Sequence, residues 1–143
     1  MRLAIKEAKK ALELGEVPVG AVIADKDENL ISAGFNLRET RTDATAHAEM
    51  IAIQIACKNL KSWRLNDLTL YVTLEPCPMC AGALVNSRIR RLVYGVADSK
   101  AGAAESLFNI TSNPNLQHRL EIRAGVLEFE CKDLLQKFFQ DRR

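Results

Sequence analysis

Apolar positions recur along the chain at two different spacings. Residues 2–14 carry an apolar stripe at every third or fourth position, typical of an amphipathic helix, and Gly15 is placed to end it. Residues 17–24 form a nearly unbroken apolar run, which predicts a strand covered on both faces. A polar turn separates this run from residues 30–36, which we expect to return as the second strand of a hairpin.

Helices and strands are expected to alternate through the rest of the chain. Residues 46–60 are apolar almost all round, which predicts a buried helix. The other expected elements are a strand at 68–73, a helix at 78–86, strands at 91–96 and 120–124, and a closing helix striped by Leu134, Leu135, Phe138 and Phe139. The regular spacing of apolar residues is absent from residues 97–119, apart from a short helix expected at 105–108. This alternation predicts an α/β three-layer sandwich, and the long irregular segment is a candidate for function.

Length and composition narrow the class of protein. At 143 residues, 48% of them hydrophobic, residues 1–143 are expected to form one domain. The chain has 20 Lys and Arg against 18 Asp and Glu, and a net charge of +2 is too weak a bias to indicate nucleic-acid binding by itself. Charges near the first residue argue against a signal peptide, and no apolar run has the length of a membrane span. We therefore expect a cytoplasmic protein that does not enter a membrane.

Residues 73–80, Thr-Leu-Glu-Pro-Cys-Pro-Met-Cys, carry the most distinctive chemistry. An apolar strand ends there, and a helix is expected to begin near Pro78 because proline is tolerated in a first helical turn. Cys77 and Cys80 are three residues apart at this helix start, so they are expected to point the same way. Helix N-terminal amides favour a thiolate, which is the form that binds a metal.

A third ligand has to come from elsewhere, and the chain has two histidines. His118 lies in a polar stretch, whereas His47 lies at the start of the apolar helix, two residues before Glu49. Residues two apart on a regular helix point about 200° apart. His47 and Glu49 can therefore face one pocket only if His47 lies in the irregular first turn, where Asp43 or Thr45 could cap the helix.

His47, Cys77 and Cys80 together offer three protein ligands and leave one position open. Three protein ligands with an open position are typical of catalytic zinc, whereas a fourth residue closes structural sites. Mixed thiolate and imidazole ligation favours zinc over other metals. A thioredoxin-like redox pair is disfavoured because it leaves His47 without a task. Cys131 is a weaker candidate ligand, and it and Cys57 are expected to be buried free thiols.

The two segments match a known signature, H-x-E followed by P-C-x-x-C, which is that of the zinc nucleobase deaminases. His47-Ala48-Glu49 supplies the first part, and Pro76-Cys77-Pro78-Met79-Cys80 supplies the second. Four further stretches resemble the bacterial tRNA adenosine deaminases that act at the wobble position: residues 17–22, Asn36, residues 73–82 and residues 98–106. The likeness covers essentially the full chain.

This resemblance implies a fold and a set of roles. The fold would be an α/β/α sandwich of the cytidine deaminase type around a central mixed five-stranded sheet. One zinc ion per chain would activate a water, and Glu49 would carry protons while wobble adenosine in a tRNA anticodon loop becomes inosine. By similarity, Asn36 would hydrogen-bond the flipped base, the backbone amide of Ala48 would hold the purine edge, and Asp98 would contact the preceding ribose.

The resemblance also implies partners. A homodimer is expected, with a tRNA anticodon stem-loop as its substrate. Phe139 and the Arg142-Arg143 end align with a C-terminal helix that lies near the RNA in that family, whereas Asn113 stands where the family often carries a histidine. Two other functions stay open. A deaminase of free bases or nucleosides, such as guanine or cytosine, would need the same metal and Glu49, and a zinc-stabilised RNA-binding module would not need Glu49.

Overall fold

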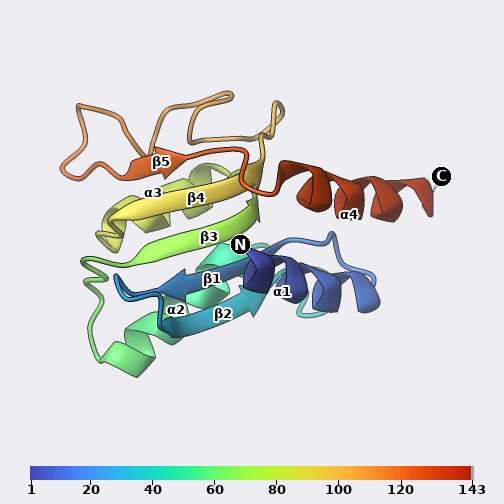
Figure 1. The fold of residues 1–143 in the computed structure, drawn as a ribbon, viewed down its shortest axis with the longest axis horizontal. Helices are drawn as coiled ribbons and strands as arrows, with labels where there is room; N and C mark the ends of the chain where they lie inside the picture. The colour runs from blue at the N-terminus through green and yellow to red at the C-terminus, as the bar shows by residue number, and fades with distance from the viewer. Residues whose placement is uncertain (143) are drawn as a thin grey trace.

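The computed structural model describes residues 1–142 of the chain. The helices are α1 (Arg2–Glu13), α2 (Ala48–Leu60), α3 (Pro78–Asn86) and α4 (Glu128–Gln140). The strands are β1 (Gly20–Ala24), β2 (Leu30–Phe35), β3 (Thr69–Leu74), β4 (Arg91–Val96) and β5 (Glu121–Arg123). The expected elements are present in the expected order, apart from the short helix at 105–108 (Figure 1). Arg143, whose expected place near RNA came from resemblance, lies outside the described residues.

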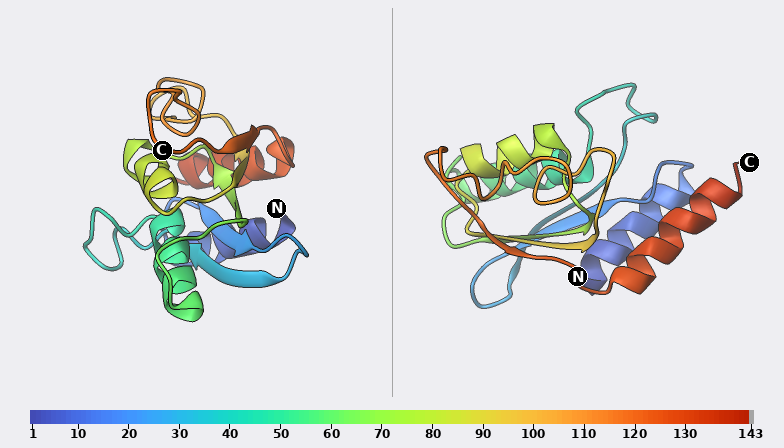
Figure 2. Two further views of the ribbon diagram at one scale, coloured as in Figure 1. Left: turned by 90° about the vertical axis from the view of Figure 1, so that its left-hand side faces the viewer. Right: turned by 90° about the horizontal axis from the view of Figure 1, so that it is seen from above.

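The strands form one mixed sheet in the order β2-β1-β3-β4-β5. β1 runs antiparallel to β2 and β3, whereas β3, β4 and β5 run parallel to one another. α1 and α4 lie side by side over one face, and α2 and α3 cover the other (Figure 2). The expected α/β/α sandwich around a mixed five-stranded sheet is confirmed.

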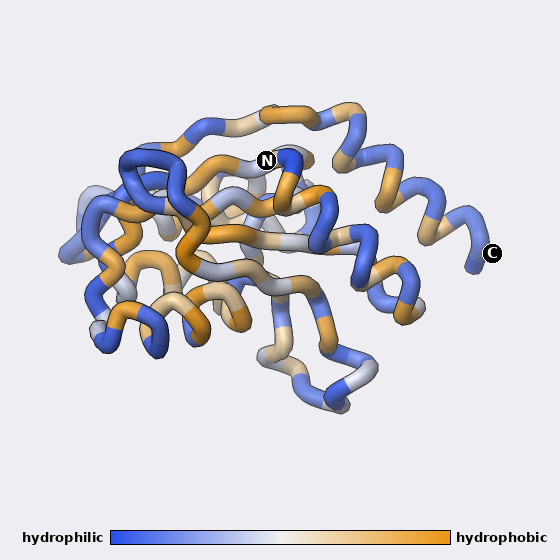
Figure 3. The backbone as a smooth tube through the Cα atoms, turned by 60° about the horizontal axis from the view of Figure 1, so that its bottom comes forward, coloured by the Kyte–Doolittle hydropathy of each residue, from blue (hydrophilic) through white to orange (hydrophobic). Residues whose placement is uncertain are grey.

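The helices on the two faces have different apolar patterns. Apolar and polar residues alternate along α4, so that one side of the helix packs and the other faces water (Figure 3). α2 is apolar on most of its circumference and buries its sheet-facing side, including Ala52 and Ala56. Its other side is not covered, and Ile55 and Leu60 are exposed. The expectation that this helix is buried all round is therefore wrong for its outer side. Among residues 1–142, every helix is too short or too polar to cross a membrane.

β1 begins at Gly20, three residues later than the apolar run suggested. Pro18 has no N–H to donate to a neighbouring strand, and the N–H of Val19 bonds to the carbonyl of Val17 instead. A Cβ at Gly20 would lie 2.1 Å from the carbonyl oxygen of Ala4. Glycine therefore lets α1 pack directly against the start of the strand. The ends of β2, β3 and β5 differ from expectation by one residue each.

α2 begins at Ala48 rather than Ala46, and the expected caps are wrong. The Oδ1 of Asp43 accepts hydrogen bonds from the N–H and the hydroxyl of Thr45, at 2.8 and 2.7 Å. These bonds close a turn before the helix. His47 itself is the N-cap residue, with extended backbone angles (φ −79°, ψ 151°).

The short helix expected at 105–108 is also wrong, and those residues form turns. The N–H groups of Glu105 and Ser106 donate to the carboxylate of Glu75, at 2.9 and 3.0 Å. The N–H groups of Leu107 and Phe108 both donate to the carbonyl of Gly102, at 3.0 Å, and not to carbonyls four residues earlier, which a helix would require. A carboxylate 30 residues earlier in the sequence thus holds a loop where the local pattern predicts a helix.

Two parallel strands bring the functional segments to one end of the sheet. Leu74 at the end of β3 pairs with Val96 at the end of β4. The cysteine segment continues from β3, and Asp98 follows β4, so both leave the sheet at the same edge. α2 and α3 also begin at this edge. Open α/β sheets bind ligands in the crevice outside the carboxyl ends of such strands.

Candidate active site

The histidine and the two cysteines of the sequence pattern meet at this edge. The Nδ1 of His47 lies 3.6 Å from the Sγ of Cys77 and 3.5 Å from the Sγ of Cys80, and the three ligand atoms lie within 4.8 Å of one another. Zinc bonds of about 2.3 Å to sulfur and about 2.05 Å to nitrogen, at a tetrahedral angle, place the two atoms about 3.6 Å apart. The donor set and its spacing therefore fit a tetrahedral metal ion with one corner left for a non-protein ligand.

Two helix starts create this arrangement. His47 is the N-cap of α2, and Cys77 is the N-cap of α3, with φ −73° and ψ 173°. Neither side chain makes a capping hydrogen bond to its own helix, so both are free to turn toward each other. Pro78 follows as the first residue of α3, and Cys80 lies within the first turn. Both helix N-termini favour negative charge at the site.

The side chains of the three candidate ligands act on one another's pKa. The interaction with the Cys80 thiol, followed by one with His47, holds the pKa of Cys77 at about 4 in spite of its burial. The same interaction raises the pKa of Cys80 above its ordinary value, and the bond to Cys77 raises the pKa of His47. A cation between the two sulfurs would favour the thiolate form of both.

Glu49 lies beside this group, in the first turn of α2. It lines the same cavity as His47 and Cys77, and only 4% of its surface is exposed. Burial raises the pKa of this carboxyl group above its ordinary range. Because His47 precedes the helix and has an extended backbone, His47 and Glu49 reach one pocket in spite of being two residues apart.

The cavity next to these residues has a volume of about 220 Å³. It is lined by Val17, Val19, Asn36, Arg38, His47, Ala48, Glu49, Leu74, Glu75, Cys77, Asp98 and Ala101. Pockets for drug-sized ligands have about 300–1,000 Å³, so this cavity suits a single heterocyclic base better than a larger molecule. All the candidate site residues of the sequence analysis except the buried Cys80 line it.

Asn36 is buried, and two backbone groups fix its orientation. Its Nδ2 donates to the carbonyl of Val17 at 3.2 Å, and its Oδ1 accepts from the N–H of Arg38 at 3.0 Å. These bonds distinguish the nitrogen end of the amide from its oxygen end. A side-chain amide can make four hydrogen bonds, so one N–H and one lone pair stay available toward the cavity.

Ala48 and Asp98 both line the cavity. Ala48 is the first residue of α2, so its N–H has no partner within the helix. The Oδ1 of Asp98 accepts hydrogen bonds from the N–H groups of Lys100 and Ala101, at 3.0 and 3.2 Å. This leaves the second carboxylate oxygen of Asp98 for other partners.

Glu75 also lines the cavity, although the sequence pattern did not indicate it as a site residue. It is 2% exposed, and it lies directly after β3. Its carboxylate accepts hydrogen bonds from the hydroxyl of Ser106 and from the N–H groups of Asp98, Ala104, Glu105 and Ser106. Burial acts to raise its pKa, but these bonds outweigh that effect and its pKa lies below the ordinary range. An acid at the end of a buried strand requires such partners, and that was the available signal.

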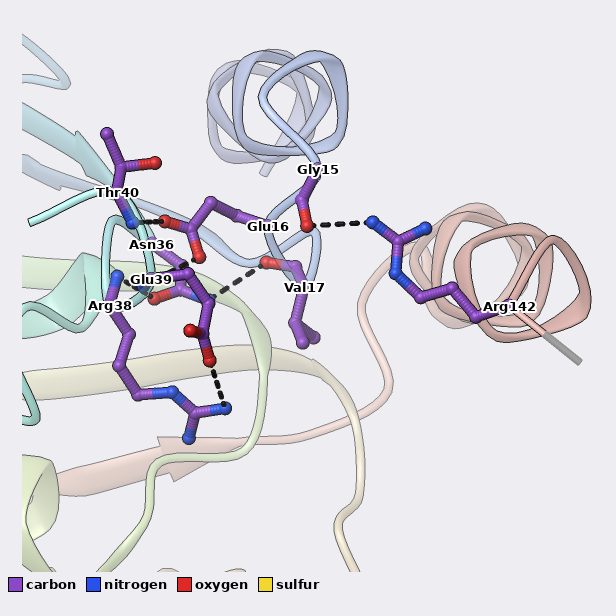
Figure 4. A network of polar contacts seen from close by, with 8 residues as sticks. All are labelled: Gly15, Glu16, Val17, Asn36, Arg38, Glu39, Thr40 and Arg142. Atoms are coloured by element: carbon purple, nitrogen blue, oxygen red, sulfur yellow. Dashed lines mark hydrogen bonds and ion pairs between the residues drawn. The ribbon is translucent and has the colours of Figure 1, made fainter. Parts of the chain in front are cut away.

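A second buried carboxylate, Glu16, holds the segment that follows Asn36 (Figure 4). It accepts from the N–H groups of Glu39 and Thr40, at 3.0 and 2.8 Å. It thereby fixes the chain just after Asn36. The guanidinium of Arg142 donates to the carbonyl of Gly15 at 2.9 Å, which joins the end of α4 to the end of α1.

The chain is similar to deaminases along its whole length. The sequence profile of the MafB19-like deaminases matches residues 1–143. The chain is 52% identical over 143 residues to a tRNA-specific adenosine deaminase of Bacillus subtilis, covering all of this chain and 88% of that one. It is 51% identical to the protein of that name from Haemophilus influenzae, of which it covers 83%.

Solved structures agree with the sequence comparison. A structure from work on A-to-I editing by tRNA:A34 deaminases at the wobble position of transfer RNA superposes with a TM-score of 0.90. The two sequences are 44% identical, and the match covers 94% of this chain and 97% of that one. The likeness thus extends from the sheet to the loops around the cavity.

Proposed function

Because the chain belongs to the MafB19-like deaminase family and, within it, to the tRNA-specific adenosine deaminases, we propose that it converts adenosine to inosine at the wobble position of a tRNA anticodon loop. One structural observation carries the proposal. Three metal ligands leave a fourth corner open next to the buried carboxyl group of Glu49, at the bottom of a cavity of base size.

The ligands proposed for one zinc ion per chain are His47, Cys77 and Cys80. When bound, zinc supplies a water that ionises near neutral pH. Glu49 would accept a proton from the attacking water and deliver it to N1 of the adenine, and would then carry the proton of the added hydroxyl to the amino group, which leaves as ammonia. The raised pKa of Glu49 suits this role, because a general acid and base works best with a pKa near the operating pH. Adenosine and water give inosine and ammonia.

The cavity walls supply contacts to the base. The free N–H and lone pair of Asn36 form the donor and acceptor pair that an adenine edge can match. The N–H of Ala48 offers a further donor to a ring nitrogen. Asp98, at the entrance, is proposed to accept a hydrogen bond from the ribose of the preceding nucleotide. The flipped base is thus held by groups whose positions are already set by the fold.

A groove outside the cavity favours RNA over a free base as the substrate. It lies between the 98–101 segment and α4, and Lys100, Lys132, Leu135, Gln136, Phe139, Gln140 and Arg142 line it. Phe139 is 52% exposed there. A basic groove with an exposed aromatic ring suits a single strand, through phosphate contacts and base stacking. An anticodon loop supplies unpaired nucleotides, which are extruded at lower cost than those of a duplex.

A homodimer is part of the proposal. The outer sides of α2 and α3 are apolar and only partly buried, and they include Met50, Cys57, Met79, Gly82 and Ala83. A helix that is apolar on all sides is normally covered, and a second copy would cover this face. A Cβ at Gly82 would meet no atom within 4 Å. Gly82→Glu should therefore leave the monomer folded and shift sedimentation from dimer to monomer, whereas an unchanged dimer would place the interface elsewhere.

A tRNA substrate and free thiols also suit a cytoplasmic enzyme, which is the location we propose. The decisive experiment incubates the zinc-loaded protein with an anticodon stem-loop that carries adenosine at the wobble position and looks for inosine. A DNA loop of the same sequence should react more weakly, because the 2′-hydroxyl distinguishes RNA from DNA. Turnover of free guanine or cytosine in place of the stem-loop would indicate the base deaminase instead. RNA binding without inosine would indicate a non-catalytic module.

A further inference from the structure

The carboxylate of Glu75 is the centre of the loop that follows β4. Its Oε1 accepts from the N–H of Asp98 at 3.0 Å and from the hydroxyl of Ser106. Its Oε2 accepts from the N–H groups of Ala104, Glu105 and Ser106, at 3.1, 2.9 and 3.0 Å. One side chain at the end of β3 therefore holds both ends of the 98–106 loop.

The contact needs a carboxylate and leaves no room for a bulkier group. Each oxygen of Glu75 faces only donors, so glutamine would put its own N–H₂ group against backbone N–H groups. The loop also packs tightly, because a Cβ on Gly102 would lie 2.4 Å from the Cδ of Glu75 and 2.5 Å from the carbonyl oxygen of Asp98. The loop is wrapped closely around this one carboxylate.

This loop forms one wall of the base cavity. Asp98 and Ala101 line the cavity, and the backbone of Asp98 is tied directly to Glu75. The carboxylate of Asp98 in turn holds the N–H groups of Lys100 and Ala101. A continuous chain of hydrogen bonds therefore runs from Glu75, which is out of contact with solvent, to the side chain proposed to meet the substrate.

Resting on the proposed function, we infer that Glu75 is a positioning residue that preforms the 98–106 wall and places Asp98 for the nucleotide before the target base. The hydrogen bonds that hold this wall come from residues of the chain itself. In the described part of the chain, the residues beyond it have no such shared acceptor. Ser112 bonds to Asn109 and Asn115 bonds to Asn113 within the segment, whereas Gln117 and His118 bond to the end of the α3–β4 connection, at Arg88 and Ile89.

The test compares KM and kcat for the anticodon stem-loop in the zinc-loaded protein. Glu75→Gln is expected to raise KM about tenfold if the formed wall falls to about one-tenth of the population, since apparent affinity scales with the competent fraction. Its kcat should change less, because His47, Glu49 and the cysteines stay in place. Ser106→Ala removes one donor, keeps the carboxylate, and should raise KM by a smaller factor. Ser32→Ala loses a buried bond to the carbonyl of Ala52, away from the wall, and should leave KM unchanged.

Two further measurements separate positioning from general damage. If Glu75 acts through Asp98, the double variant should raise KM by less than the product of the factors measured for Glu75→Gln and Asp98→Asn. Hydrogen exchange followed by mass spectrometry should show faster exchange at residues 98–106 in Glu75→Gln, with the zinc content unchanged. Multiplying KM factors, an unchanged exchange pattern, or loss of zinc with a collapse of kcat would each overturn the inference. A wild-type protein that makes no inosine would refute the proposed function, whereas the exchange result would still decide whether Glu75 holds the wall.

Discussion

Glu49 and Glu75 are both buried at the wall of one cavity, yet their surroundings act on them in opposite directions. Glu49 is 4% exposed and Glu75 is 2% exposed. Burial dominates at Glu49 and raises its pKa. At Glu75 the hydrogen bonds from Asp98 and residues 104–106 outweigh burial and lower the pKa. Five donors face the carboxylate of Glu75, whereas burial is the largest influence on Glu49.

This contrast matches the two roles proposed for these residues, a proton carrier at Glu49 and a structural anion at Glu75. A carboxyl group that gains and loses protons needs a pKa moved toward neutrality, and burial with few donors provides that. A carboxylate that holds a loop needs to stay ionised, and several N–H groups provide that. The two acids therefore identify the chemical side of the pocket and its scaffold. Of the predictions below, the first two act on the chemical side of the pocket, and the last two compare the two acids.

The largest expected effect comes from removing the metal. Dialysis against a chelator should abolish inosine formation, because no metal would then lower the pKa of the attacking water next to Glu49. The 98–106 loop should keep its slow hydrogen exchange, since Glu75 and its donors do not involve the metal ligands. Added zinc should restore activity. A loop that exchanges faster in the stripped protein would contradict the separation of the two sides.

Replacement of Glu49 should have the next largest effect. Glu49→Ala is expected to fold, to bind zinc and to lower kcat about 10²–10⁴-fold, the usual contribution of a positioned general acid and base. Zinc content by atomic absorption and kcat for the stem-loop check the two parts. KM should stay close to that of the wild type, in contrast to Glu75→Gln. Near-normal turnover would exclude the proton-carrying role.

Stability should change in opposite directions at the two acids. In the metal-free protein at pH 7, Glu75→Gln should lower the free energy of unfolding by about 1–3 kcal/mol, because buried donors lose their acceptor. Glu49→Gln should raise it by about 0.5–2 kcal/mol, as is common where a strained functional group is removed. Chemical denaturation of the three proteins measures both changes. Two destabilised variants would show that Glu49 also has a structural role.

The pH dependence of stability should distinguish the same pair. Because the pKa of Glu75 is lowered by folding, the unfolded chain binds more protons at this residue than the folded chain does. The contribution of Glu75 to the free energy of unfolding is therefore full above the ordinary pKa of 4.5 and is lost as the pH falls through the folded pKa. The raised pKa of Glu49 has the opposite effect on stability. The free-energy cost of ionising this buried carboxyl group grows as the pH rises from 4.5 through the folded pKa. Thermal melts of wild type and Glu75→Gln should therefore converge in acid. Curves that stay parallel from pH 7 to pH 3 would contradict this assignment.

The sequence predicted much of the fold, and it proposed the residues that the structure brings together at the site. Apolar spacing located four helices and five strands within residues 1–142, because side-chain periodicity and local hydrogen bonding depend on neighbours in the chain. The spacing of Cys77 and Cys80 around Pro78 predicted that the two thiols lie together. His47 was predicted as the third ligand because the chain has few other candidates. The wrong start of β1 and the wrong caps of α2 also have local causes. Pro18 delayed β1, and Asp43 and Thr45 closed a turn instead of capping α2.

Only the tertiary structure decided what depends on distant partners. The donors to Glu75 lie 23 to 31 residues further along the chain, and no periodicity relates an acid at a strand end to amides in a later loop. Residues 104–106 donate to this carboxylate in a loop where the local pattern predicted a helix. The sequence by itself determined which elements form and which residue types could bind a metal. The fold decided which buried acid keeps its charge, because ionisation depends on the donors that packing brings within reach.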